Sequence, residues 1–316
     1  MASPAPAIRK VAVIGLGSMG PGMMARLARG GLEVSGFDIA EAARERATGL
    51  LSRAAAVLDA LAIAPPTAGE GAIRIEGSLE ETVAGADLVI ENVPEKIETK
   101  AALYRQVEPL IDQAAILATD TSGIPITSLQ AHVAHPRRFV GMHWSNPPHI
   151  IPMIEVIGGA ATAPGTVAAV RGLIHGLGLL PVVIKKDVPG FVENRVLYAL
   201  LRECVDLVEG GVIDAEGLDT VVRWGIGMKL AVVGPMRLLD MAGLDIYEAV
   251  SSFLNKELAD RADVSPLVTA ATARGRLGMK TGGGLFDYTR EELERLPAER
   301  ARALVAVRRV LESGGG

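Results

Sequence analysis

A histidine and a glutamate, His143 and Glu155, lie twelve positions apart in the segment GMHWSNPPHIIPMIEVIGG. The prolines between them (Pro147, Pro148 and Pro152) stiffen the connecting chain. A neutral imidazole can accept a proton near neutral pH. A carboxylate bonded to the other ring nitrogen fixes the tautomer and stabilises the imidazolium that forms. The pair therefore indicates general-base catalysis at the ends of two strands.

The same pair has a simpler interpretation, as a structural pair across two strands. The residue types alone do not separate the two. His149, which follows the proline pair, would either face a substrate or pack within its loop. These alternatives stay open until the elements that carry the residues are placed.

A glycine-rich turn near the N-terminus predicts a dinucleotide site. It follows an apolar run of buried-strand type at residues 11–14, and it precedes a helical pattern and a second strand that ends at Asp38. In such turns the glycines permit the bend, the approach of a pyrophosphate and close helix packing. Asp38 would accept hydrogen bonds from ribose hydroxyls, and residues 39–41 carry no basic group, which favours NAD over NADP. The expected cofactor contacts are Gly15, Leu16, Gly17, Ser18, Met19, Gly20 and Asp38.

Further strand and helix patterns extend this unit to about residue 187. Strand patterns lie within 86–95, 115–122, 138–144, 151–159 and 180–186, and helical patterns at 97–110 and 162–178. This alternation predicts an α/β fold with a Rossmann-like doubly wound sheet in a domain of residues 1–187. Because such sheets bind ligands at the carboxyl ends of their strands, the loops at 91–95, 120–122 and 143–149 are expected to share one crevice.

The pattern after residue 187 is helical. A long amphipathic stretch covers 191–211, and the next helix begins at an N-cap, Asp214, and ends near Gly225 or Gly227. Residues 234–258, 265–278 and 291–312 give further helices, with an interruption expected at Pro297. We expect an all-helical substrate and dimerisation domain, 188–316, that pairs with a second copy as a homodimer.

Composition excludes several classes of protein. The net charge is −5 with the signs interspersed, which argues against a nucleic-acid partner. The longest apolar stretch, residues 167–184, contains Arg171 and is broken by Pro181, so we expect no membrane span. The first ten residues lack a signal-peptide core, and the single cysteine, Cys204, allows no internal disulfide. We expect a cytoplasmic protein that acts on a small molecule without a metal ion.

Seven stretches of the chain resemble, in order and spacing, the 3-hydroxyacyl-CoA dehydrogenase superfamily. They are VIGLGSMGPG, DLVIENVPE, TDTSGIPIT, GMHWSNPPHIIPMIEVI, KKDVPGFVENRV, VGPMRLLDMAGLD and MKTGGGLFDY. The resemblance covers nearly the full length. It implies an NAD-dependent dehydrogenase.

The resemblance also implies roles for individual residues. The catalytic histidine of the family lies in an H-x-x-N-P segment, which His143, Asn146 and Pro147 match, and its histidine-orienting glutamate is matched by Glu155. The other implied positions are Ser122 and Asn194, which would hydrogen-bond the reacting oxygen, and Glu95 and Lys100, in the loop beside the cofactor.

Two departures from the acyl-CoA members bear on the substrate. Those members tend to have two phenylalanines after the histidine, where this chain has Trp144 and Ser145. They also tend to have a lysine-rich helix after the second strand, whereas no lysine occurs here between Lys10 and Lys96. A CoA phosphate would find few cationic partners there. NPPHIIP and GMKLAVVGP instead resemble members that act on small substrates without CoA, and Lys229 would then meet a substrate carboxylate.

The resulting hypothesis is NAD-dependent oxidation of a small carboxylated aromatic aldehyde. Several motifs, ENVPE and DTSGIPIT among them, resemble a member of the family that oxidises a pyridine aldehyde in vitamin B6 degradation. Trp144 would either stack on such a ring or pack in the core. Asn146 and His149 are further candidate substrate contacts. The alternative functions are a 3-hydroxyacyl-CoA (3-hydroxybutyryl-CoA) dehydrogenase and oxidation of another small hydroxy acid.

Overall fold

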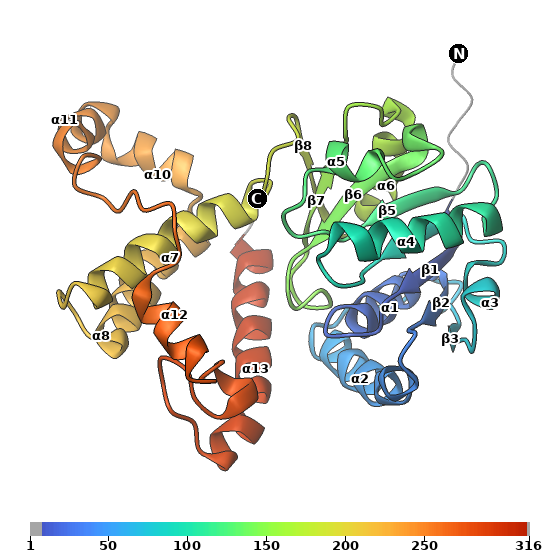
Figure 1. Ribbon diagram of the computed structural model, residues 1–316, viewed down its shortest axis with the longest axis horizontal. Helices are drawn as coiled ribbons and strands as arrows, with labels where there is room; N and C mark the ends of the chain where they lie inside the picture. Colours follow the sequence, from blue (N-terminus) through green and yellow to red (C-terminus); the bar gives the residue numbers. More distant parts are fainter. Residues whose placement is uncertain (1–7, 315–316) are drawn as a thin grey trace. The chain divides into compact units, whose positions relative to one another are not determined.

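The computed structural model describes residues 8–314, in two compact units that divide after Arg195 (Figure 1). The sequence had placed this boundary near residue 187. Most of the N-terminal segment that was searched for a signal peptide lies outside the described residues. No described helix is both long enough and apolar enough to cross a membrane.

The first unit is built on one eight-stranded sheet, in the order β3-β2-β1-β4-β5-β6-β7-β8. Neighbouring strands are parallel except for β6 and β7, which are antiparallel. This is the predicted doubly wound α/β fold. The strands are β1 (Lys10–Ile14), β2 (Glu33–Phe37), β3 (Ile73–Ile75), β4 (Leu88–Glu91), β5 (Ile116–Thr119), β6 (Phe139–Trp144), β7 (Met153–Ile157) and β8 (Leu180–Ile184).

Helices cover both faces of this sheet because successive strand residues point to opposite sides. Val11 and Val13 of β1 point into a core that α1, α2 and α6 share. Ala12 and Ile14 point into a second core, which α3, α4 and α5 share. The bounds are α1 (Gly20–Arg29), α2 (Glu41–Ala60), α3 (Leu79–Val83), α4 (Ile97–Val107), α5 (Ile126–Gln130) and α6 (Pro164–Gly176), with short 3₁₀ helices at Glu108–Leu110 and Pro136–Arg138.

The sequence assigned no elements to residues 41–85, where the structure has α2, β3 and α3. The 20-residue helix α2 buries only four side chains, three of them alanines, so its apolar pattern is weak. The three-residue strand β3 lies at the edge of the sheet, where few apolar residues are needed. Both elements are therefore poorly marked by hydrophobic periodicity.

The second unit is helical, as predicted. Its elements are α7 (Glu193–Glu209, which begins in the first unit), α8 (Ala215–Thr220), a π-helix (Val221–Gly227), α9 (Met228–Val232), α10 (Pro235–Ala242), α11 (Leu244–Leu254), α12 (Pro266–Ala273), a 3₁₀ helix (Met279–Thr281) and α13 (Arg290–Gly314). Asp214 is the expected N-cap, and its side chain accepts a hydrogen bond from Gly217 N. The interruption expected at Pro297 was wrong, because α13 runs through it. A proline removes one backbone donor, and the rest of a 25-residue helix remains bonded.

Candidate active site

His143 and Glu155 form a buried hydrogen-bonded pair. Strands β6 and β7 are antiparallel, and their register sets the two residues directly opposite each other. Side chains at paired positions lie on the same face of a sheet. The imidazole Nδ1 and the carboxylate Oε2 are 2.8 Å apart. Because Oε2 is an acceptor, Nδ1 carries the ring hydrogen, and Nε2 is left with the lone pair that takes up a proton.

The start of helix α7 holds the other oxygen of Glu155. Oε1 accepts hydrogen bonds from Val192 N at 3.0 Å and Glu193 N at 3.1 Å. Free N–H groups at a helix N-terminus favour a negative charge. Burial acts to raise the pKa of Glu155, but the bonds from His143, Glu193 and Val192 outweigh it and the pKa is lowered. Glu155 is thus ionised, which fits the predicted role of orienting the imidazole.

The pKa of His143 is raised above its ordinary value. Burial opposes the charged form, but the hydrogen bond to Glu155 and the negative charges of Asp120, Glu155 and Glu193 outweigh that effect. These carboxylates come from the end of β5, from β7 and from the start of α7. Three acids around one imidazole stabilise the imidazolium that proton uptake would form.

This electrostatic arrangement predicts the acid limb of the pH profile. Protonated His143 cannot accept a proton, so kcat/KM should fall as the pH drops through a value above about 6.5, the ordinary histidine pKa. In Glu155→Gln the limb should move to lower pH, because that carboxylate raises the pKa. Initial rates between pH 5 and 9 would measure the acid limb of the wild type and of Glu155→Gln. An acid limb at the same pH in both proteins would contradict the assignment of that limb to His143.

Glu193 and Ser145 extend this cluster, and sequence reasoning missed both roles. Ser145 Oγ donates to Glu193 Oε1 at 2.5 Å. One ring nitrogen of His143 and one oxygen each of Glu155 and Glu193 lie within 4.8 Å of one another. Such a group could attract a cation, but the hydrogen bond between His143 and Glu155 already joins two of its members. That the reaction needs no metal stays a prediction.

The glycine turn has the geometry that a dinucleotide requires. Gly15 has φ +101°, and a Cβ there would lie 2.3 Å from Asn92 O, so only glycine fits. At Gly17 a Cβ would meet no atom within 4 Å, which leaves open space beside the backbone for a pyrophosphate. No acidic residue occurs in the first turn of α1 to repel it. Asp38 follows β2, and its Oδ2 accepts a hydrogen bond from Leu16 N at 2.8 Å.

A basic residue outside the stretch 39–41, Arg44, lies beside Asp38. The Arg44 guanidinium donates to Asp38 O at 2.6 Å and lies over the Phe37 ring. Position 44 lies beyond residues 39–41, and the first turn of α2 brings it back to the end of β2. A guanidinium there is the kind of group that binds a ribose 2′-phosphate.

We therefore expect Asp38→Ala to weaken NAD binding and to relax discrimination against NADP. Losing hydrogen bonds to a charged acceptor should raise the Kd for NAD by about 10- to 100-fold, and removing the carboxylate removes its repulsion of a 2′-phosphate beside Arg44. Titration of each cofactor would measure the ratio of Kd values. Glu41→Ala, which removes an exposed acid nearby, is the matched control. An unchanged ratio in Asp38→Ala would count against the ribose assignment.

Glu95, Ser122 and Asn194, which the family resemblance assigned to the cofactor loop and to the reacting oxygen, lie together in the structure. Glu95 Oε1 accepts from Ser122 N at 2.9 Å and from Gly123 N at 3.0 Å. Asn194 Nδ2 donates to Ser122 O at 2.6 Å. Burial acts to raise the pKa of Glu95, but hydrogen bonds from Thr121 and Gly123 and the charge of Lys100 lower it overall. Their contact with substrate or cofactor stays a prediction.

Lys100 has a different environment from the one expected of a cofactor contact. Its side chain is 1% exposed, and Nζ lies 2.7 Å from Glu91 Oε1 and 3.4 Å from Glu95 Oε2. Tyr104 and Thr119 donate to the other oxygen of Glu91. Lys100 therefore stabilises the loop of residues 91–95 through its ion pairs with Glu91 and Glu95, and any influence on the cofactor would pass through Glu95.

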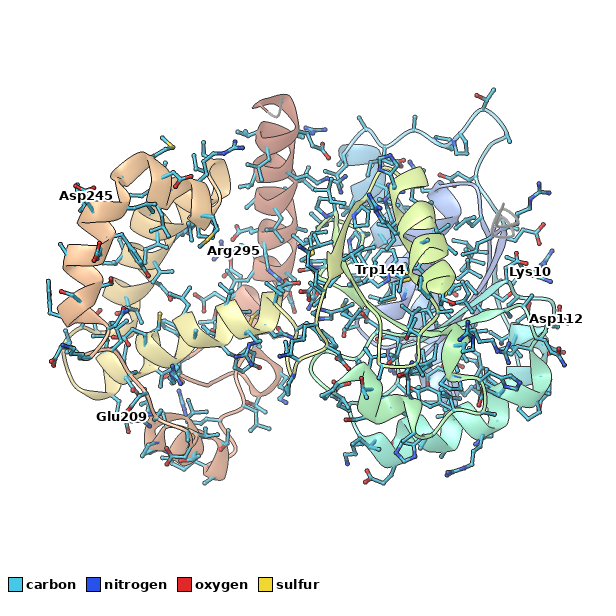
Figure 2. The ribbon with its side chains drawn as sticks, turned by 90° about the horizontal axis from the view of Figure 1, so that it is seen from above. Lys10, Asp112, Trp144, Glu209, Asp245 and Arg295 are labelled. Carbon is cyan, nitrogen blue, oxygen red and sulfur yellow. The ribbon has the colours of Figure 1, made fainter. Side chains whose placement is uncertain are left out.

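Trp144 packs in the core, which favours the second of the two predicted roles. Its side chain is 2% exposed and lies among apolar neighbours within the first unit (Figure 2). Asn146 is exposed in the loop after β6. His149 is partly buried against α1, where a Cβ at Gly22 would lie 2.7 Å from its Nδ1, and burial lowers its pKa. Lys229 lies exposed in α9 of the second unit.

The three loops that were predicted to share a crevice, 91–95, 120–122 and 143–149, contact one another, and the crevice itself stays a prediction. Glu95 is bonded to residues 121–123, and Asp120 is bonded to Trp144. All three loops follow the carboxyl ends of neighbouring parallel strands, β4, β5 and β6. His143 and the glycine turn after β1 therefore lie at the same edge of the sheet.

The chain matches two domain families. The NAD-binding domain of 3-hydroxyacyl-CoA dehydrogenase matches residues 10–188, and the C-terminal domain of 3-hydroxyacyl-CoA dehydrogenase matches residues 190–288. The chain belongs to the 3-hydroxyacyl-CoA dehydrogenase family. It is an NAD-dependent oxidoreductase, as the sequence predicted.

Particular relatives refine this placement. The chain is 66% identical over 305 residues to 5-formyl-3-hydroxy-2-methylpyridine 4-carboxylate 5-dehydrogenase of Mesorhizobium japonicum, covering 96% of this chain and 99% of the relative. A crystal structure of an enzyme of that name, described as an NAD+-dependent dismutase, superposes with a TM-score of 0.95 at 66% identity over 96% and 99% of the two chains. The (S)-3-hydroxybutyryl-CoA dehydrogenase of Ralstonia eutropha superposes with a TM-score of 0.69 at 32% identity, over 90% and 100%.

Proposed function

We propose that this protein oxidises 5-formyl-3-hydroxy-2-methylpyridine 4-carboxylate, or a close aromatic analogue, to the corresponding acid with NAD. The observation that supports this choice of substrate is the 66% identity, over 96% of the chain, to an enzyme named for that reaction. The reaction would place the protein in vitamin B6 degradation. The buried pair of His143 and Glu155 supports the chemistry, because aldehyde oxidation needs a positioned proton acceptor.

The residues of the site supply the proton chemistry of this reaction. Water adds to the aldehyde to give a gem-diol. His143 Nε2 removes a diol hydroxyl proton while Glu155, on Nδ1, stabilises the imidazolium. Bound NAD supplies the acceptor for the hydride that leaves the same carbon. The carbon is thereby oxidised from aldehyde to acid.

A direct test compares this substrate with that of the alternative function. Purified protein with the pyridine aldehyde and NAD should form the dicarboxylate, measured by liquid chromatography. The competing 3-hydroxybutyryl-CoA dehydrogenase activity would instead oxidise NADH with acetoacetyl-CoA. No acid from the aldehyde, together with turnover of acetoacetyl-CoA, would reverse the proposal. The resemblance in fold to the Ralstonia eutropha enzyme makes that comparison necessary.

The same site also supports dismutation. One hydrated aldehyde would lose a hydride and a proton and become the acid, and a second aldehyde would gain both and become the alcohol. The solved relative is described as a dismutase, which supports this extension. With NAD far below the aldehyde concentration, acid and alcohol should then form in equal amounts. Acid that never exceeds the NAD supplied would contradict dismutation but not oxidation.

The homodimer and the cytoplasmic location expected from the sequence remain part of this proposal. No described residue of α7 to α11 is buried, and exposed apolar side chains recur along these helices, such as Trp224, Ile246 and Phe253. A surface of this kind supports pairing with a second copy. Light scattering after gel filtration should give twice the chain mass, and a monomer at micromolar concentration would contradict the dimer.

A further inference from the structure

Two polar residues connect the glycine turn to the strand that carries His143, and the sequence assigned no individual role to either of them. Asp120 follows β5 and is 7% exposed. Its Oδ1 accepts a hydrogen bond from Trp144 N at 2.7 Å, one residue beyond His143. Asn92 follows β4, and its backbone N donates to Ile14 O at the end of β1.

The Asn92 amide joins Asp120 to the first residue of α1. With its nitrogen towards Asp120, Nδ2 lies 3.1 Å from Asp120 Oδ2 and Oδ1 lies 3.0 Å from Gly20 N. The reverse orientation gives one bond of 3.4 Å from Nδ2 to Gly15 O, but it sets the amide oxygen against a carboxylate oxygen and the amide nitrogen against a backbone N–H. Pairing each donor with an acceptor therefore fixes the orientation.

We propose that Asn92 and Asp120 form a hydrogen-bond bridge that positions His143 relative to the glycine turn. Gly20 N donates to Asn92, Asn92 donates to Asp120, and Trp144 N donates to Asp120. This order requires an amide at 92, which accepts and donates, and a carboxylate at 120, which accepts twice. The two side chains are positioning residues. The inference rests on the proposed function, because it assumes that proton removal and hydride transfer occur between these two ends.

The burial of Asp120 is consistent with a bonding role. Burial raises the pKa of Asp120 to about 8, and the bond from Trp144 N and the charge of His143 act against that rise, so the bridge with two accepting oxygens belongs to the ionised form of Asp120. The bond from Asn92, which the carboxylate accepts, acts in the same direction as those two. A buried carboxyl is costly without such partners, and here both of its oxygens have one.

An exchange of the two side chains tests the order of the bonds. In Asp120→Asn, the new amide must turn its oxygen to Trp144 N, so one donor of the bridge is left facing another. In Asn92→Asp, two carboxyl groups face each other. In the exchange variant Asn92→Asp/Asp120→Asn, the carboxylate now at position 92 accepts from Gly20 N and from the amide now at position 120. The oxygen of that amide accepts from Trp144 N. All three bonds are restored with the roles of the two side chains reversed.

We expect each single variant to lose about 10- to 100-fold in kcat with little change in KM, because misplacement of about 1 Å can cost that much. The exchange variant should recover most of the loss. Asp112→Asn, the same change at an exposed aspartate (Figure 2), should leave kcat unchanged. Unaffected single variants, or an exchange variant no faster than the singles, would overturn the bridge.

The midpoints of urea unfolding of the wild type, the two single variants and the exchange variant test the bridge separately from the proposed function. They report the bonds without any substrate, so they remain informative if the wild type does not oxidise the aldehyde. A midpoint lowered in each single variant and recovered in the exchange variant supports the bridge. Losses that simply add overturn it. Recovery of the midpoint without recovery of kcat overturns the positioning role.

Discussion

Replacing His143 by glutamine should reduce kcat by at least about 100-fold, because general-base catalysis typically contributes about 10²- to 10⁴-fold. The side chain keeps its size and can still hydrogen-bond Glu155, but it cannot accept a proton. NAD affinity should change little, since the glycine turn and Asp38 are separate from the His143–Glu155 pair. Acid formation from the aldehyde and a cofactor titration would measure the two effects.

Controls distinguish loss of the base from general damage. His135→Gln makes the same substitution at an exposed histidine paired with Glu108, and it should leave the rate unchanged. Thermal melting should show that His143→Gln is folded. More than about a tenth of the wild-type rate in His143→Gln would contradict the general-base role, given the effect expected of such a base.

Replacing Lys100 by methionine should cost about 3–5 kcal/mol in the free energy of unfolding, as expected when one partner of a buried ion pair is removed. Glu91 is fully buried, and Lys100 is the charged partner on its Oε1. The methionine fills similar space but leaves the carboxylate without a countercharge. Urea denaturation would measure the loss.

Lys96→Met is the matched control, because it removes the same charge from an exposed position four residues earlier. Its effect should stay within about 0.5 kcal/mol. The double variant Glu91→Gln/Lys100→Met should recover part of the loss, since no unpaired charge remains buried. A loss below about 1 kcal/mol in Lys100→Met would show that Glu91 does not depend on this lysine.

The fold could be predicted because its main features lie within short stretches of the sequence. The glycine turn, the terminal acid Asp38 and the alternation of strands and helices predicted the doubly wound sheet. The pair of His143 and Glu155 was predicted from residue types and a family pattern, and the antiparallel register then placed the two side chains opposite each other. The N-cap at Asp214 was predicted because a cap is a contact within one turn.

The meeting of loops 91–95, 120–122 and 143–149 was predicted, but most of the individual contacts between distant segments were not. Asp120 bonds to Trp144 across neighbouring strands, and Glu193 lies beside Glu155 although 38 residues separate them. Such pairs depend on strand order, which apolar periodicity does not encode. The same limit applies to Lys100, whose burial beside Glu91 is set by packing of α4.

The pairing of His143 with Glu155 across strands β6 and β7 has a consequence for protein engineering. His143 and Glu155 are paired through β6 and β7, whereas residues 145–152 connect those two strands. Ile150 is fully buried and His149 packs against α1, so the connector is not free to change length. Sequence libraries are therefore best confined to its exposed positions, such as Asn146, where substitutions leave the pairing of the two strands in place.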